Sequence, residues 1–405
     1  MKHLLKLISS LTILSTGILS VSCTNKQTNP NKNINEQNSS SRNRRSIPDA
    51  SEIKLETVVS EDIKNKGIAA LKKVFKDQEE AFGSFHTYQD VVDQLKVYLK
   101  DMGIYHLDYL KLTNENTKQN TLEVDSNKSL NNINISYFDR VETFTPKTVL
   151  KDEVKEKYDS SKNQLLQIGY KFEPTLKSIK IKKIDAKTKK VPIHLPLKIN
   201  SLDNAFRNLE SETIENLDKW NTSNIKYLTE TFSDTTNFNQ DISSWNVSNV
   251  IDMAQMFAGA NKFNQNLNSW NTSNTESMVG MFWEAKAFNG DISKWNVKKV
   301  ENMQSMFSGA IKFNQDLNKW DTSNVKNMEG MFSNTIAFNG NISNWDVSSV
   351  TSMKQMFQNA KGFKQNLKLW NVSNVTHVEN FRKDVKNNIT DQYLPNFKDS
   401  LIKTI

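Results

Sequence analysis

Few side chains in this sequence are suited to catalysis or metal binding. The five histidines are scattered, at His3, His86, His106, His194 and His377. No two of them have the spacing of a metal site, and only His86, near Asp90 at an expected helix start, approaches a catalytic pair. The sequence also lacks glycine-rich phosphate loops and zinc motifs. We therefore expect no enzymatic activity, no metal, no cofactor and no small-molecule substrate.

The single cysteine, Cys23, points to lipid attachment. It follows a basic start and an apolar run over residues 7–19 that is too short to span a bilayer comfortably. The run leads into LSVSC, which looks like a bacterial lipoprotein signal, although Ser20 stands where leucine is usual. Such a signal implies cleavage of residues 1–22 and a diacylglycerol thioether on Cys23. An ordinary signal peptide with an incidental cysteine is the alternative.

Residues 23–50 are expected to be the lipid anchor and a disordered linker. They are rich in Asn, Ser, Lys and Gln and carry almost no large apolar side chain, so burial cannot offset the entropy of ordering them. Within residues 24–48, five basic residues against one glutamate place much of the net charge of +8 in this tail, which favours an anionic membrane surface or simply a solvated linker. The repeats that follow are nearly neutral, so we expect no nucleic-acid partner.

Residues 51–195 are predicted to form a small α+β domain. Ser60 can cap one helix, and Thr87 with Asp90 resembles the capping box of a second. Apolar residues that alternate over 166–172 predict a strand, which a turn should join to a second strand as a hairpin.

Seven tryptophans recur every 25 residues in the second half of the chain, at Trp220, Trp245, Trp270, Trp295, Trp320, Trp345 and Trp370. This regularity marks an internal repeat and predicts a solenoid, in which neighbouring coils bury one another's apolar faces. Counted from each tryptophan as position 0, the apolar residues at 0 and +2 alternate like a short strand. Those at +5, +8, +11 and +12 have the spacing of a helical return.

The spacing resembles the leucine-rich-repeat pattern L-x-x-L-x-L, with Ile242, Trp245 and Val247 in its three places. More closely, the run W-[ND]-[TV]-S-N-V-x-x-M-x-x-M-F is similar to BspA-like leucine-rich-repeat surface proteins of the mycoplasma-type lipoprotein family. The resemblance implies an α/β solenoid over residues 196–382, a right-handed coil of about seven 25-residue repeats. A C-terminal cap at residues 383–405 and a role in adhesion or host interaction are also implied.

A second period of 50 residues lies within the first. Position −3 alternates between leucine and isoleucine, and position +2 alternates between threonine and valine in all but the last coil. This alternation predicts duplication of a two-coil unit, so the number of repeats should be able to change without loss of the fold.

Polar residues beside the expected strand are the first binding candidates. Positions +1 and +3 should point outward, and the +3 residues of five successive coils are Ser248, Ser273, Lys298, Ser323 and Ser348. This uniform stripe would bind a partner through weak contacts repeated in register, or would only keep the protein soluble.

Trp283 is the one tryptophan outside the 25-residue register. Serine, alanine and glutamine occupy the equivalent positions, and a core position would not tolerate that range, so we expect Trp283 to be exposed. Ile311 and Ile336 likewise share a position with threonine, asparagine and lysine. Exposed aromatic residues are favoured binding anchors, although isolated apolar residues on a surface are common.

These features predict a lipid-anchored protein on the extracellular face of the cell membrane, which presents a repeat solenoid to a protein or host-surface ligand. A variable structural coat or immune decoy is the alternative, and an envelope enzyme acting through residues 51–195 is a third.

Overall fold

The computed structural model describes residues 59–124 and 130–405, so Cys23, the leader and the linker lie outside the described residues. The described residues belong to one compact unit. Its helices are α1 (Glu61–Asp77), α2 (Tyr88–Asp101) and α3 (Asp399–Ile402), with 3-10 helices η1 (Leu107–Tyr109), η2 (Glu115–Thr117), η3 (Leu217–Lys219) and η4 (Asp391–Tyr393). Its strands are β1 (Leu110–Leu112), β2 (Ile133–Tyr137), β3 (Arg140–Phe144), β4 (Glu153–Val154), β5 (Lys157–Tyr158), β6 (Leu165–Gln167), β7 (Tyr170–Glu173) and β8 (Ser178–Ile181).

The two predicted helix starts are confirmed. The Ser60 side chain accepts a hydrogen bond from the backbone N–H of Ile63, and α1 begins at Glu61, directly after Ser60. The Thr87 hydroxyl and the Asp90 carboxylate cap α2 reciprocally. Both helices contact the antiparallel sheet β1–β2–β3 and share one apolar core with it.

The predicted hairpin is confirmed, because β7 and β8 pair antiparallel with Glu173 opposite Ser178. The single strand predicted over 166–172 is wrong, since β6 ends at Gln167 and β7 begins at Tyr170. Gly169 interrupts it where the chain passes so close to Glu156 that a Cβ would lie 2.8 Å from the Glu156 backbone nitrogen.

The core divides earlier in the chain than the boundary predicted at residue 195. Val154, Ile168 and Ile181 belong to the same buried cluster as the repeats, whereas the core of α1 and α2 ends at Val149. The segment from Val154 to Ile181 carries short strands whose apolar residues share the core of the repeats. This segment therefore closes the near end of the repeat stack.

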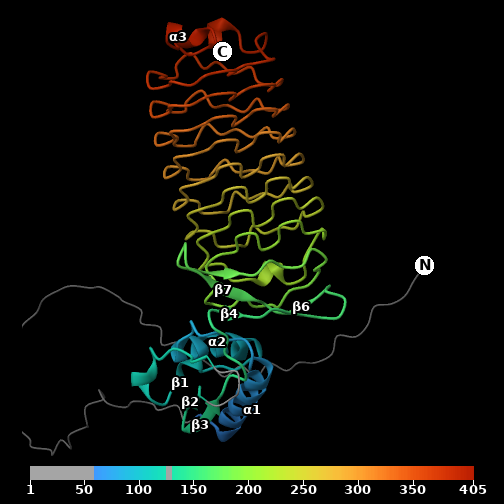
Figure 1. Ribbon diagram of the computed structural model, residues 1–405, viewed down its shortest axis with the longest axis vertical. Coiled ribbons are helices and arrows are strands. Elements are labelled where there is room, and N and C mark those ends of the chain that lie inside the picture. Colours follow the sequence, from blue (N-terminus) through green and yellow to red (C-terminus); the bar gives the residue numbers. More distant parts are fainter. Residues whose placement is uncertain (1–58, 125–129) are drawn as a thin grey trace, which may run out of the picture. The chain divides into compact units, whose positions relative to one another are not determined.

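The repeat region consists of coils stacked one on the next (Figure 1). Parallel bridges connect equivalent residues of successive coils, and they run Ser201–Tyr227–Asp252–Ser277–Asn302–Asn327–Ser352–His377. The bridged residue is position +7, so the strand expected at positions 0 and +2 is misplaced. Each coil is thereby joined to its neighbours by backbone hydrogen bonds.

The helical return predicted between +5 and +12 is wrong. In each of seven successive coils, positions +10 and +14 have left-handed backbone, as at Gln255 (φ 54°) and Gly259 (φ 69°). A right-handed helix needs negative φ at every residue. The N–H groups of this segment instead reach the next coil, as from Gln255 to the Val279 oxygen (2.8 Å) and from Gly259 to the Trp283 oxygen (2.7 Å).

Both ends of the stack are covered. At the near end the Ile181 N–H donates to the Ser201 oxygen. At the far end, which carries α3 in Figure 1, the Asn380 N–H donates to the Thr404 oxygen, and the Phe397 ring packs edge-on against Phe381. Within residues 59–124 and 130–405, no helix has the length and apolarity needed to cross a bilayer.

Candidate functional site

The repeat tryptophans form the spine of the stack, on which any surface site depends. All seven are at most 4% exposed. From Trp270 to Trp370 the rings of successive coils lie nearly parallel, as for Trp295, Trp320 and Trp345, with centroids 6.5 and 6.1 Å apart. Each indole N–H donates to the carbonyl of position −3 in the preceding coil, as from Trp320 to Ile292 (3.2 Å). An indole that is both buried and bonded holds two coils in a fixed register.

Two phenylalanine columns run beside this spine. The +12 rings of Phe282, Phe307 and Phe332 stack 5.7 Å apart. Within one coil, the Phe307 ring lies 4.0 Å from the Phe313 ring of the second column. The interior is therefore filled with rings in register, and the candidate binding residues must lie on its outside.

The polar stripe expected at +1 and +3 folds into turns instead of a flat strand. In all five coils the +1 side chain accepts a hydrogen bond from the +3 backbone N–H, at 2.9–3.2 Å, and the +3 residues are Ser248, Ser273, Lys298, Ser323 and Ser348. Asparagine and aspartate form such turns readily. Of the five +3 residues only Lys298 is exposed, and the four serines are half-buried, so this stripe stabilises the coil and offers few free groups to a partner.

Other polar side chains form ladders between coils. The Asn274 amide donates to the Ser248 carbonyl (2.7 Å), and the Asn374 amide donates to the Ser348 carbonyl (2.7 Å). On another side, the Asn289 side chain accepts from the Asn314 N–H (2.9 Å). Much of the polar surface is thus committed to the protein's own backbone.

Trp283 differs from the other tryptophans, as its position outside the register predicts. Its side chain is 45% exposed. Its backbone is nevertheless fixed, because its N–H donates to Gly280 (3.0 Å) and its carbonyl accepts from Gly259 (2.7 Å). Left-handed residues on both sides, Gly280 and Glu284, define the turn. The indole therefore projects from a rigid support.

Ile311 and Ile336 lie in one column on consecutive coils, three residues after the position that Trp283 occupies in its own coil. The Ala337 N–H donates to the Ile311 carbonyl (3.1 Å), which fixes their register. Ile311 is 41% exposed and Ile336 is partly buried. The three candidate apolar residues therefore come from three successive coils on one side of the stack, which we call the Trp283 face.

Leu369, which the sequence analysis missed, is 93% exposed. It occupies position −1, where the other coils carry lysine, serine or asparagine. The reasoning that singled out Trp283 would have found it. An aromatic group at the surface of the first part was also missed, since Tyr105 is 74% exposed and the Tyr109 and Phe138 rings stack at 4.3 Å. No repeat exists there for comparison, so no pattern in the sequence indicated this group.

His86 forms a buried link between the first part and the repeat core. It is 3% exposed, its Nδ1 accepts from the Gly83 N–H (3.1 Å), and its Nε2 lies 3.2 Å from the Tyr170 hydroxyl. That hydroxyl donates to the Ala81 carbonyl (2.8 Å). Burial lowers the pKa of His86 to about 4, so the ring is neutral near pH 7. Each polar atom of this set has a partner, which fits a structural role.

The four histidines that the structure describes do not come together into a metal site. His194 pairs with Asp101 of α2, and His377 contacts the Thr376 hydroxyl. Across the part of the chain that the structure describes, no three His, Cys, Asp or Glu side chains are grouped as metal ligands.

Comparison with known families identifies the repeats alone. Residues 200–317 and 291–393 match the family described as "Mycoplasma protein of unknown function, DUF285". Together the two matches span slightly less than half of the 405-residue chain. This similarity agrees with the mycoplasma-type repeat protein that the tryptophan motif predicts. Searches of curated proteins and of solved structures found no match.

Proposed function

We propose that this protein is a lipid-anchored surface protein whose repeat stack binds other proteins, in the manner of an adhesin. The observation that carries the proposal is the Trp283 face, where a large aromatic side chain is exposed on a rigid turn. Rigid exposed aromatic residues lose little entropy on binding and commonly anchor protein interfaces.

The anchor is supported by the sequence around Cys23, where a basic and apolar leader ends in LSVSC. A diacyl group supplies the two hydrophobic chains that stable attachment requires. The linker of residues 23–50 would then hold the folded part away from the membrane at the extracellular face. Labelling with radioactive palmitate in a bacterial host, lost in a Cys23→Ser variant, tests this part separately.

We further infer that the stack is a leucine-rich-repeat-like solenoid of the BspA-like type. The parallel bridges at position +7 and the buried residues at −3, 0 and +2 support this assignment. The absence of helical residues between +5 and +14 departs from the α/β form that the resemblance implies. A stack of short coils, each with left-handed backbone at positions +10 and +14, describes the repeats better than an α/β solenoid does.

Binding by the stack is tested with charge reversals at three positions of the coil. Beads carrying residues 24–405 are applied to cultured cells, in parallel with beads carrying Lys286→Glu, Lys298→Glu or Lys326→Glu. These exposed lysines occupy positions +16, +3 and +6 of their coils, so each variant alters a different position of the repeat surface. We expect the parent to attach and one reversal to weaken attachment roughly tenfold. A parent that does not attach, or three variants that all attach like the parent, would contradict the proposal.

A coat or decoy role is the second candidate, and the polar ladders favour it. Side chains at +1, +4 and −6 repeat on successive coils and bond the protein's own backbone, so most of the surface is uniform and offers few free groups. A variant lacking residues 246–295 would lose two whole coils and keep the alternation of the rest. Unchanged cell attachment with altered antibody recognition in this variant would favour the coat role.

A further inference from the structure

We infer that the Trp283 face binds an acidic protein segment that carries apolar side chains. This inference rests on the proposed binding function and specifies the partner. It depends on two properties of the face, which are the apolar residues already described and an unbalanced set of lysines around them.

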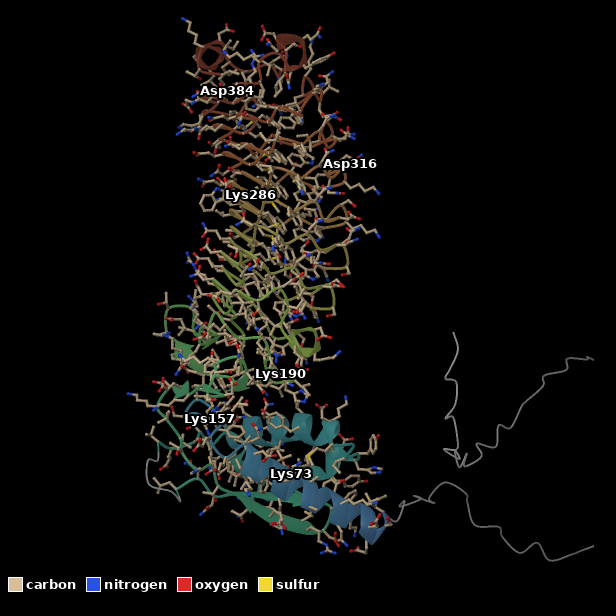
Figure 2. The ribbon with its side chains drawn as sticks, turned by 90° about the vertical axis from the view of Figure 1, so that its right-hand side faces the viewer. Lys73, Lys157, Lys190, Lys286, Asp316 and Asp384 are labelled. Carbon is tan, nitrogen blue, oxygen red and sulfur yellow. The ribbon has the colours of Figure 1, made fainter. Side chains whose placement is uncertain are left out.

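The lysines lie on the same part of the coil as Trp283, Ile311 and Ile336. Positions +13 to +17 in the five coils from Ala258 to Gly362 contain one acidic residue, Glu284, and four lysines, Lys262, Lys286, Lys312 and Lys361. All four lysines are exposed. Among the described residues, none of their ammonium groups forms an ion pair or a hydrogen bond. Figure 2 shows Lys286 and Asp316 toward opposite sides of the stack, so the acidic residues of position −4 do not neutralise this face.

Lysines elsewhere on the stack are paired more often. Lys326 bonds Glu301 of the preceding coil at 2.7 Å, and Lys298 lies 3.7 Å from Asp321. The Trp283 face therefore combines a net positive charge with exposed apolar side chains. An anion without apolar groups would satisfy the lysines and leave the indole in water, whereas an acidic segment with apolar side chains would satisfy both.

The dimensions fit an extended segment that lies along the stack. Coils joined by parallel bridges lie about 4.8 Å apart, so the four steps from Lys262 to Lys361 cover about 19 Å. An extended chain of about six residues has this length at 3.3 Å per residue. Its apolar side chains would contact Trp283 and Ile311, and its carboxylates would lie beside the lysines of neighbouring coils.

Two synthetic polymers serve as probes. The random copolymer of glutamate and tyrosine supplies carboxylates with aromatic groups, and polyglutamate of equal length supplies carboxylates alone. Binding of each to the chain of residues 24–405 is measured by fluorescence anisotropy at low and at physiological salt. We expect the copolymer to bind at least about tenfold more tightly than polyglutamate, and its affinity to fall with salt.

Substitutions assign the binding to the face. Trp283→Ser and Lys286→Glu should each weaken copolymer binding at least about fivefold. Serine already occupies the Trp283 position in other coils, as at Ser308 and Ser333, so the fold should tolerate it. Leu369→Ser and Lys326→Glu remove an exposed apolar residue and a charge elsewhere, and should leave binding unchanged.

The inference fails if polyglutamate binds as tightly as the copolymer, or if Trp283→Ser binds like the parent. It also fails if phosphatidylglycerol vesicles bind the parent more tightly than the copolymer and lose this binding in Trp283→Ser, because the face would then be a lipid contact. A third result would separate the two proposals. If Lys298→Glu or Lys326→Glu weakens cell attachment and Lys286→Glu does not, the proposed function stands, but the assignment of binding to the Trp283 face is overturned.

Discussion

The repeat stack and the first part of the described chain are stabilised by different kinds of contact. In the stack each contact recurs, so the indole bond of Trp320 to Ile292 has six counterparts in other coils. Around α1 and α2 each contact occurs once, as does the bond from the Tyr137 hydroxyl to the Tyr105 carbonyl (2.8 Å). The stack should therefore behave as a sum of similar neighbour interactions, whereas the first part depends on individual residues.

Loss of a spine tryptophan should have the largest effect. Trp320→Ala removes a ring stacked between two others and its bond to Ile292, which should lower the free energy of unfolding by about 3–5 kcal/mol. Trp295→Ala and Trp345→Ala should cost the same within about 1 kcal/mol, because their surroundings are equivalent. Urea unfolding measures all three. Trp283→Ala is the control and should change stability by less than about 0.5 kcal/mol.

His86 tests the opposite case of a contact that occurs once. Its pKa is about 4 in the folded protein and about 6.5 when unfolded, so between these values the unfolded chain binds the proton first. The free energy of unfolding should therefore fall as pH is lowered through this window, by up to about 3 kcal/mol. Unfolding midpoints are compared at pH 7 and 4.5 for the parent, His86→Gln and the exposed-site control His106→Gln. Equal pH dependence in the parent and His86→Gln would refute the assignment.

A close approach between coils gives the next effect. A Cβ at Gly340 would lie 2.0 Å from the backbone oxygen of Gln315, and a Cβ at Gly290 would lie 2.0 Å from the backbone oxygen of Gln265. Gly340→Ala should therefore cost about 1–3 kcal/mol by forcing two coils apart. Gly330→Asn is the matched control, because its nearest neighbour is a serine hydroxyl at 3.3 Å and asparagine tolerates its left-handed φ of 61°. Equal losses in the two variants would exclude a steric cause.

The 50-residue alternation should have a smaller effect. The buried hydroxyls of Thr222, Thr272 and Thr322 each donate to the +1 carbonyl of the next coil, at 2.8–3.1 Å. Thr322→Val should cost about 0.5–1.5 kcal/mol in a thermal or urea unfolding experiment. Thr351→Val removes an exposed hydroxyl bond and should cost less. A larger loss in Thr351→Val than in Thr322→Val would show that the hydrogen bonds of the buried threonines do not explain the alternation at position +2.

The same contrast explains what could be predicted from the sequence. Seven tryptophans at one spacing indicated the stacked core, and the odd position of Trp283 indicated its exposure, because comparison between coils separates buried from exposed positions. The helical return was wrong because apolar spacings of three and four arise both from a helix and from turns that repeat every four residues. Glycine, asparagine or aspartate at +14 in most coils, as at Gly259 and Asn334, was the signal against a helix.

The strand expected at positions 0 and +2 was misplaced for a related reason. The apolar side chains at 0 and +2 point inward whether the backbone there is a strand or a turn. Only the asparagine or aspartate at +1 distinguishes the turn from the strand. In the first part, capping residues such as Thr87 located the helices because capping is local. The cluster of Tyr109 and Phe138 joins residues far apart in the chain, and a single sequence carries no local signal for such a contact.

Hydrogen exchange of the indole N–H groups tests the account most directly. The chain has eight tryptophans, and labelling them with nitrogen-15 gives one resonance for each ring. Seven indoles should exchange slowly, because they are buried and donate to carbonyls of the preceding coil. One should exchange rapidly and should disappear in Trp283→Phe. Several rapidly exchanging indoles, or a protected resonance assigned to Trp283, would contradict both the bonded spine and the exposed anchor.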